Sequence, residues 1–271
     1  MSLDPNEEPD LAPSTVPRRK EPRVASTHRT LAWHGASHAG RIRQGNQDRF
    51  GIDSERRLFL VADGMGGHTG GEIAAEIAVE TIAREIAKRP LAGNAERDAY
   101  RVRDAINVAN DEICKAARLD KKIDKMGTTV VCLLVCQDGA VVAHLGDSRV
   151  YHVRDGNLRL VTKDHSLFNE LVSQGKLEER DRKDFLFSHV ISKALGTGTR
   201  SAYADVAIFD LQPGDQVLLC SDGLHGPLSD DEILELLMFT PDATSAAEGL
   251  VDAANAAGGP DNVTAVVVRF E

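Results

Sequence analysis

The sequence is poor in aromatic residues and in long apolar runs. Aromatic side chains make up 4% of the 271 residues, so the core has to be built mainly from Val, Leu, Ile and Ala. No apolar run approaches the roughly 18–20 residues that a membrane-spanning helix needs. The N-terminus also lacks the apolar stretch of a secretory signal. These absences argue against a membrane protein and against a secreted one.

Cysteine is scarce, and basic residues are outnumbered. The four cysteines form no C-x-x-C pair, which predicts free thiols in a reducing cytoplasm rather than a disulfide framework. There are 42 acidic residues against 32 basic ones, with a formal net charge of −10. Binding to nucleic acid relies on Lys and Arg against phosphate, so a nucleic-acid partner is not expected.

Proline is concentrated at the N-terminus, where residues 1–27 hold five of the ten prolines together with mixed charges. Proline at that density removes backbone donors and blocks helix formation. We therefore predict a disordered tail over residues 1–27 and one folded domain over residues 28–271.

The apolar pattern of residues 28–271 predicts an α+β fold. Continuously apolar runs bounded by Gly or Asp are typical of strands covered on both faces. The expected strands are Leu58–Ala62, Thr129–Cys136, Ala140–Leu145, Val150–Val153, Gln216–Cys220 and Val263–Phe270. Helices are expected after two capping boxes (Thr69 with Glu72, Ser229 with Glu232), over about 96–118 and over about 245–256. The order of elements suits antiparallel sheets with helices packed outside.

Acidic turns recur where apolar strands end or begin. They are Ala62-Asp63-Gly64, Gly146-Asp147-Ser148, Ser221-Asp222-Gly223 and Gly259-Pro260-Asp261. Carboxylates that converge on one point repel one another unless a cation lies between them. Oxygen ligands without His or Cys select Mg²⁺ or Mn²⁺, and two such ions suit the hydrolysis of phosphate esters. Each Asp-Gly pair is by itself also typical of a turn, so the spacing leaves both interpretations open.

With these turns in place, the sequence resembles the metal-dependent serine/threonine protein phosphatases of type 2C (PPM family) in their bacterial form. The resemblance runs from about Trp33 to Phe270. Eight motifs appear in the family's order: RQGNQD (43–48), VADGMGGH (61–68), MGTT (126–129), LGDSR (145–149), DHS (164–166), ISKALG (191–196), CSDGL (220–224) and GPDNVT (259–264).

The resemblance implies a four-layer α-β-β-α sandwich of two antiparallel sheets flanked by helix pairs, with a metal site at one end. It implies that Asp63 bridges two Mn²⁺ or Mg²⁺ ions, that the Gly64 carbonyl binds one of them, and that Asp222 and Asp261 bind the other. Asp147 and Asp222 match the site of a weaker third ion. Among the catalytic residues, Arg43 matches the phosphate-binding arginine, and Asp48 matches an acidic group that orients metal-bound water.

Two departures from the family pattern affect this assignment. Gln47 stands where relatives with a metal-site Glu have that residue, and an amide is the poorer ligand. Met65 stands where animal members have a histidine after the metal-binding Asp-Gly, and the histidine here is His68. His68 is therefore a candidate proton donor to the leaving alkoxide, with capping of the loop before the next helix as the alternative.

The segment of about 165–190 resembles the variable flap beside the bacterial active site. Its charge run from Glu178 to Asp184 is equally typical of a solvated helical face. The functional interpretation is that the flap governs substrate entry and the weak third ion.

We therefore expect a cytoplasmic, monomeric enzyme that hydrolyses phosphoserine and phosphothreonine in proteins by a water bridging two metal ions. The resemblance implies phosphoprotein partners, among them a Ser/Thr kinase of the same organism. One alternative is a regulatory pseudophosphatase that binds a phosphoprotein without cleaving it. A second is a phosphohydrolase with an aspartyl nucleophile, but the Asp-x-Asp strand end that this chemistry needs does not occur near these strands.

Overall fold

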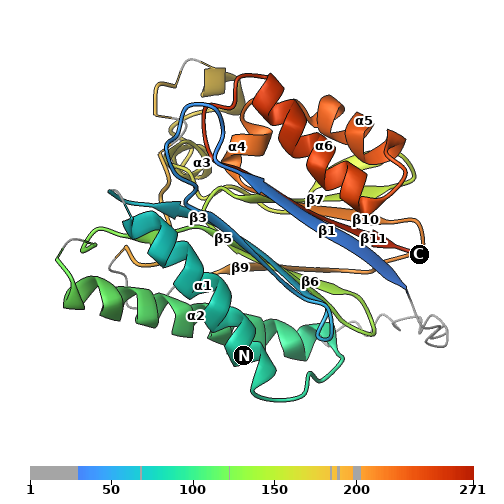
Figure 1. Cartoon of the computed structure of the whole chain (residues 1–271), viewed down its shortest axis with the longest axis horizontal. Coiled ribbons are helices and arrows are strands. Elements are labelled where there is room, and N and C mark those ends of the chain that lie inside the picture. The colour runs from blue at the N-terminus through green and yellow to red at the C-terminus, as the bar shows by residue number, and fades with distance from the viewer. Residues whose placement is uncertain (1–29, 68, 122, 184, 188–189, 198–202) are drawn as a thin grey trace, which may run out of the picture.

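Two antiparallel sheets lie face to face, and a layer of helices covers each outer face (Figure 1). The computed structural model describes residues 30–67, 69–121, 123–183, 185–187, 190–197 and 203–271. The predicted tail over 1–27 and the candidate His68 lie outside the described residues. The four-layer α-β-β-α sandwich expected from the sequence is confirmed.

The first sheet contains both ends of the described domain. Its strand order is β1-β11-β10-β7-β8, so the first strand pairs with the last one. The strands are β1 (Leu31–His38), β7 (Arg149–Arg154), β8 (Asn157–Leu160), β10 (Gln216–Cys220) and β11 (Val263–Phe270). Three of the expected strands fall here, while β1 and β8 carry too few consecutive apolar residues to be recognised.

The second sheet has the order β2-β3-β5-β6-β9, with the short β4 paired to β3. Its strands are β2 (Asp48–Asp53), β3 (Leu58–Met65), β4 (Gly127–Thr128), β5 (Val130–Val135), β6 (Ala140–Leu145) and β9 (Asp205–Phe209). Every residue of β5 and β6 is buried, as their continuous apolar runs predicted. Neither β2 nor β9 was expected, because both are edge strands with mixed polarity.

Helices cover the two outer faces in pairs. The pair α1 (Gly70–Ala87) and α2 (Ala95–Leu119) packs on the second sheet, and the pair α5 (Asp230–Phe239) and α6 (Ala243–Ala256) covers the first. The described residues also form three short helices, namely α3 (Leu167–Ser173), the 3₁₀ helix η1 (Glu179–Lys183) and α4 (Asp222–His225). Buried apolar side chains such as Phe59, Leu133 and Val266 fill the space between the sheets. No helix among the described residues is both long and apolar enough to cross a bilayer.

The two capping boxes have different outcomes. Ser229 and Glu232 form the predicted reciprocal pair at the start of α5. Thr69 does occupy the N-cap of α1, but its side chain makes no capping hydrogen bond, so that box is wrong. The reason is competition, because the Glu72 carboxylate pairs instead with Arg49 on the neighbouring strand β2. A charged partner gives the stronger bond of the two.

Candidate functional site

Five aspartates from distant parts of the chain gather at one end of the sandwich. Asp48 opens β2 and lies directly across from Asp63 on β3. Asp222 follows β10 as the first residue of α4, Asp261 precedes β11, and Asp147 lies in the turn between β6 and β7. Their charges act on one another. The charges of Asp48, Asp147 and Asp222 raise the pKa of Asp63, and the charge of Asp261 raises the pKa of Asp222. The convergence that the spacing alone left open is therefore present.

Asp48 is a buried carboxylate that is bonded on one side only. Its Oδ2 accepts hydrogen bonds from the Ser221 and Thr264 hydroxyls, each at 2.7 Å. Its Oδ1 is buried and has no partner among the described residues. Burial, opposed by the two hydroxyls and reinforced by Asp222 and Asp261, raises the pKa of Asp48 to about 6. This carboxylate can therefore hold or release a proton near neutral pH.

Asp63 and Asp222 form a carboxyl–carboxylate pair. Burial raises the pKa of Asp63 well above its usual value, and the charges of Asp48, Asp222 and Asp147 raise it further. Burial and Asp261 also raise the pKa of Asp222, whereas a hydrogen bond from Asp63 works in the opposite direction. Without a cation, such a pair relieves its repulsion by sharing a proton.

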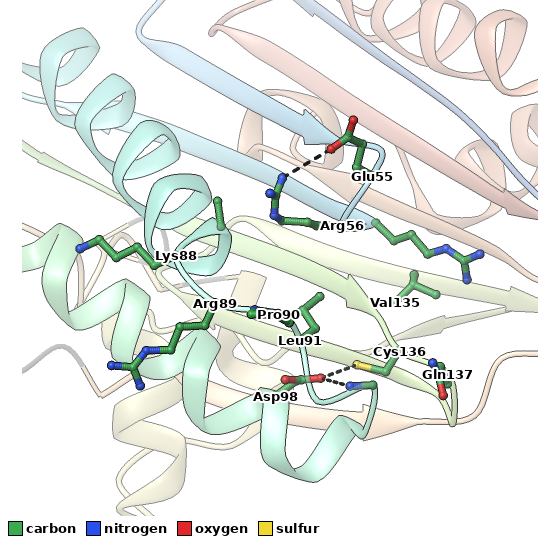
Figure 2. Close-up of a pocket in the computed structure, with 13 residues that line it drawn as sticks. Glu55, Arg56, Lys88, Arg89, Pro90, Leu91, Asp98, Val135, Cys136 and Gln137 are labelled. Atoms are coloured by element: carbon green, nitrogen blue, oxygen red, sulfur yellow. Dashed lines mark hydrogen bonds and ion pairs between the residues drawn. The ribbon is translucent and has the colours of Figure 1, made fainter.

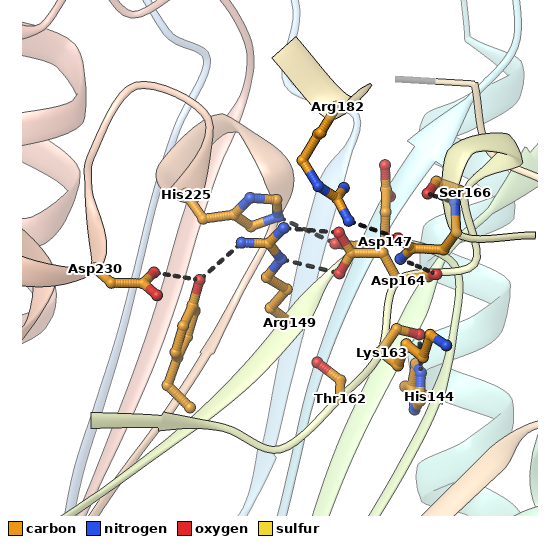
Figure 3. A network of polar contacts seen from close by, with 12 residues as sticks. His144, Asp147, Arg149, Thr162, Lys163, Asp164, Ser166, Arg182, His225 and Asp230 are labelled. Atoms are coloured by element: carbon orange, nitrogen blue, oxygen red, sulfur yellow. Dashed lines mark hydrogen bonds and ion pairs between the residues drawn. The ribbon is translucent and has the colours of Figure 1, made fainter. Parts of the chain in front are cut away.

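Asp147 lies close enough to Asp222 and Asp63 for the charges to act on one another. Burial, followed by the charges of Asp222 and Asp164, raises the pKa of Asp147 to about 7. Its backbone carbonyl lies 3.1 Å from His225 Nε2, and its Oδ1 has no partner among the described residues. Figure 3 shows Asp147 beside the ion pair of Arg149 and Asp164.

These carboxylates fit a divalent cation. Asp48, Asp147 and Asp222 each have a buried oxygen that no group in the described part of the chain satisfies. A buried carboxylate in a protein is normally paired or bound to a metal. The donors are all oxygens, the set that Mg²⁺ and Mn²⁺ prefer, and these ions keep several water ligands, so the carboxylates need not touch one another.

Close backbone packing holds the site in place. A Cβ on Gly64 would lie 2.1 Å from the Gly71 carbonyl oxygen, and one on Gly223 would lie 1.9 Å from that of Asn262. The Thr128 hydroxyl donates to the Asp63 carbonyl at 2.9 Å. The Asn262 amide donates to the Gly45 carbonyl at 2.8 Å and orients the turn after Asp261. Only glycine fits at the two Asp-Gly steps, so these are more than surface turns.

Arg43 is an exposed cation paired with Asp261 of the cluster. Its Nη2 donates to Asp261 Oδ2 at 2.7 Å, and its side chain is 56% exposed. An exposed guanidinium can exchange one oxyanion partner for another at small cost. Arg43 is therefore placed where it can reach an anion bound at the aspartates.

A compact group of His144, His165 and Asp205 lies next to the turn that carries Asp147, with His165 bonded to Gly146. Among the described residues it is the one set of three metal-type ligands whose atoms lie within 4.8 Å of one another. His165 Nδ1 accepts a hydrogen bond from the Gly146 amide at 3.1 Å, so the ring's proton is on Nε2 and no lone pair remains there for a metal. The His144 and His165 rings are stacked, 4.8 Å apart and 7° from parallel, which also prevents both from pointing at one ion. The group is therefore structural.

A cavity of about 580 Å³ lies at the opposite end of the second sheet, beside the β2–β3 turn and the C-terminal end of α1 (Figure 2). Its buried carboxylate, Asp98, accepts hydrogen bonds from the Ala92 and Gly93 amides, both at 2.9 Å. Figure 2 shows Lys88 and Arg89 extending away from Cys136 rather than converging on the cavity. The buried carboxylate here is satisfied by backbone amides of the chain itself, in contrast to the aspartate cluster.

One polar network near the site was not anticipated. Arg149 donates two hydrogen bonds to Asp164, at 2.9 and 2.7 Å, and a third to the Tyr151 hydroxyl at 3.0 Å. Tyr151 donates in turn to Asp230 on α5 at 3.1 Å. Arg149 and Asp164 lie in two of the recognised motifs, so their residue types were visible, but only the fold brings the two motifs together.

Comparisons with known proteins agree with this geometry. The family model described as "Protein phosphatase 2C" matches residues 34–255. The chain is 33% identical over 233 residues to the serine/threonine phosphatase stp of Listeria monocytogenes, an alignment that covers 85% of this chain and 92% of the relative. It is 34% identical over 239 residues to the serine/threonine protein phosphatase PstP of Mycobacterium tuberculosis, covering 88% of this chain and 44% of that longer protein.

Solved structures give the same result. The structure of the M. tuberculosis phosphatase PstP/Ppp aligns with a TM-score of 0.81 at 33% identity, covering 89% of this chain and 99% of the other. The catalytic domain of PstP in complex with two manganese ions aligns with a TM-score of 0.77 at 32% identity, covering 89% of this chain and 98% of the other.

Proposed function

The chain belongs to the protein phosphatase 2C family of serine/threonine protein phosphatases, and we propose that it hydrolyses phosphoserine and phosphothreonine in proteins at the cluster of five aspartates. The observation that carries this proposal is the set of buried, unpartnered carboxylate oxygens on Asp48, Asp147 and Asp222. A cluster of this kind is stable as a set of anions only with divalent cations bound.

The enzyme depends on Mn²⁺ or Mg²⁺, and we propose which groups hold the ions. Asp63 lies across from Asp48 and is hydrogen-bonded to Asp222, and it is the candidate bridging ligand, with the Gly64 carbonyl next in the chain. Asp222 and Asp261 are the candidates for a second ion, and Asp147 with Asp222 for a weaker third. Two bound ions supply a lowered pKa for a bound water and positive charge for the phosphoryl oxygens.

The chain's own residues perform the remaining tasks. Arg43 leaves Asp261 and binds the phosphoryl oxygens, for which its planar fork is suited. Asp48 accepts a proton at Oδ1, because its Oδ2 is already occupied by the Ser221 and Thr264 hydroxyls. His68 is retained as the proposed proton donor to the leaving alkoxide.

The proposed partners of the enzyme are its substrates. Phosphorylated proteins are the substrate class, and the phosphorylated segment of a Ser/Thr kinase from the same organism is a candidate substrate. The binding-only alternative is not favoured, because all five aspartates of the cluster are present in this chain.

The test is hydrolysis of a phosphothreonine peptide by the full chain, titrated with Mn²⁺, with Mg²⁺ and with a chelator. We expect activity that requires the metal and disappears with the chelator. Asp63→Asn serves as the matched inactive variant. Binding of the peptide without turnover at saturating Mn²⁺ would instead support the pseudophosphatase alternative.

A further inference from the structure

Arg182 connects the outer part of the flap to helix α3. It lies on η1, and its Nη2 donates to Asn169 Oδ1 at 2.7 Å. The same guanidinium lies 4.2 Å from the centroid of the Phe168 ring, a cation–π contact. Among the described residues of the flap, this is the one polar side-chain contact between η1 and α3.

Asn169 continues the connection toward the aspartates. It is buried, and its Nδ2 donates to the backbone carbonyl of Asp164 at 2.8 Å. The Asp164 carboxylate is held by Arg149, and Figure 3 shows Arg182 reaching down from the flap toward Asp164 and Asp147. The pair lies close enough to Asp147 for Asp164 to raise the pKa of that residue and for Arg149 to lower it.

The Asp164–Asn169 segment is also bonded directly to the turn that carries Asp147. The His165 amide donates to the Gly146 carbonyl at 2.8 Å, and the Gly146 amide donates to His165 Nδ1 at 3.1 Å. Any displacement of this segment is therefore transmitted to the residue next to Asp147.

Simple packing does not account for Arg182. Phe168 is fully buried and already packs against Phe185, with the ring centroids 5.6 Å apart. The neighbouring Arg180 lies on the same short helix, yet its guanidinium pairs with Glu178 and its side chain is 77% exposed. Two arginines two residues apart thus differ in whether they contact α3.

We infer that Arg182 is a positioning residue: it holds Asn169 against the Asp164 carbonyl and thereby fixes the segment that supports Asp147. The contacts themselves do not depend on the activity, whereas the effect on metal binding at Asp147 rests on the proposed function.

The first experiment is amide hydrogen exchange of the full chain without metal or substrate. We expect Arg182→Ala to raise the exchange rates of residues 167–172 by about fivefold, because the charged hydrogen bond and the ring contact are both lost. Arg180→Ala is the matched control and leaves these rates unchanged. Adding Arg182→Ala to Asn169→Ala changes the rates little beyond Asn169→Ala alone, because Arg182 acts through Asn169. Unchanged exchange in Arg182→Ala would overturn the inference.

The second experiment is hydrolysis of p-nitrophenyl phosphate titrated with Mn²⁺. Arg182→Ala is expected to shift the activating Mn²⁺ midpoint upward by about threefold while kcat at saturating Mn²⁺ stays within about twofold, and Arg182→Lys falls between it and the wild type. Faster exchange with an unshifted midpoint would mean that the contact only stabilises the flap, which overturns the positioning role. An inactive wild type would contradict the proposed function. The exchange experiment would still show whether Arg182 holds Asn169 in place.

Discussion

An aspartate lies at each end of strand β10, and the surrounding residues shift the pKa values of the two in opposite directions. Asp222 follows the strand, keeps an unpartnered oxygen, and has a raised pKa because of burial and of Asp261. Asp215 precedes the strand and is 2% exposed. It accepts hydrogen bonds from Arg154 at 2.9 and 2.6 Å and from the Gln212 amide at 2.8 Å. Burial alone would raise the pKa of Asp215, but these bonds outweigh it and the pKa is lowered.

The difference separates a structural carboxylate from a functional one. Asp215 finds its cation within the chain, so the fold gains from keeping it charged. The aspartates around Asp222 have mainly other aspartates for neighbours. Of the two guanidinium groups near them in the described part of the chain, Arg43 is exposed and Arg149 is already paired with Asp164. The repulsion at the acidic end is therefore relieved either by a shared proton or by an added cation, and each prediction below tests one side of this contrast.

The largest effect is expected when a carboxylate of the acidic end is neutralised. Asp222→Asn should lower kcat/KM for p-nitrophenyl phosphate with Mn²⁺ by about 10³-fold, since a metal ion contributes several kcal/mol to the transition state. The same variant should be at least as stable as the wild type in a chelator, because one repelling charge is removed. Thermal unfolding in the chelator checks the second part. Activity within a few-fold of the wild type would refute the site.

Neutralising Asp215, at the other end of β10, should change the stability of the fold rather than the activity. Asp215→Asn is expected to destabilise the fold by about 3 kcal/mol, because it leaves Arg154 without its buried partner. Urea unfolding measures this loss, and the residual activity of the folded fraction should match the wild type. The control is Asp210→Asn, whose side chain is 65% exposed where it meets Arg154, and which should cost no more than about 0.5 kcal/mol. Equal losses in the two variants would remove the contrast.

The pH dependence of this loss has a defined sign. The folded pKa of Asp215 is lower than the value of about 3.9 for an unfolded aspartate. Its stabilisation is therefore fully present above that unfolded pKa and disappears as the pH falls through the folded pKa. The stability gap between the wild type and Asp215→Asn should narrow as the pH falls below about 4. A gap that widens in acid would contradict the assignment.

Much of the fold was predictable because the buried strands have continuous apolar runs. The runs in β5, β6, β10 and β11 gave the centre of both sheets. The strands β1, β2, β8 and β9 were missed; all four lie at sheet edges, where a strand needs only one apolar face. Thr69 shows a further limit: its capping box failed because Glu72 found Arg49, a residue on another element.

The site was only partly predictable for a related reason. The aspartates and glycines were visible as residue types at strand ends, and the family resemblance gave each a role. Whether a carboxylate oxygen lacks a hydrogen-bond partner depends on which donors the rest of the described chain brings close to it, and a local sequence pattern does not contain that information. The link from Arg182 through Asn169 to Asp164 crosses from the flap to a motif, and neither Arg182 nor Asn169 has a sequence signature. Such contacts are defined by tertiary structure alone.

Metal binding should distinguish the two ends of β10 by stability rather than by activity. Mn²⁺ at about 100 times its dissociation constant is expected to stabilise the wild type by about 2.7 kcal/mol, or roughly 5–10 °C in Tm. Asp222→Asn should lose most of this shift, whereas Asp215→Asn should keep it on a lower baseline. Differential scanning calorimetry with and without a chelator measures both. A full shift in Asp222→Asn would show that the ion binds elsewhere.

Arg43 and Arg154 each bond an aspartate at one end of the contrast: Arg43 bonds Asp261 at the acidic end, and Arg154 bonds Asp215 at the other. Arg154 is fixed by a buried carboxylate, while Arg43 makes one exposed bond to Asp261 and so remains available to a phosphate. Arg43→Gln should therefore change stability in a chelator by no more than about 0.5 kcal/mol. It should raise KM for p-nitrophenyl phosphate by about tenfold with a smaller change in kcat, because a two-point contact to the phosphoryl oxygens is lost. Steady-state kinetics at saturating Mn²⁺ measures this split, and a fall in kcat with an unchanged KM would place Arg43 outside the substrate-binding contacts.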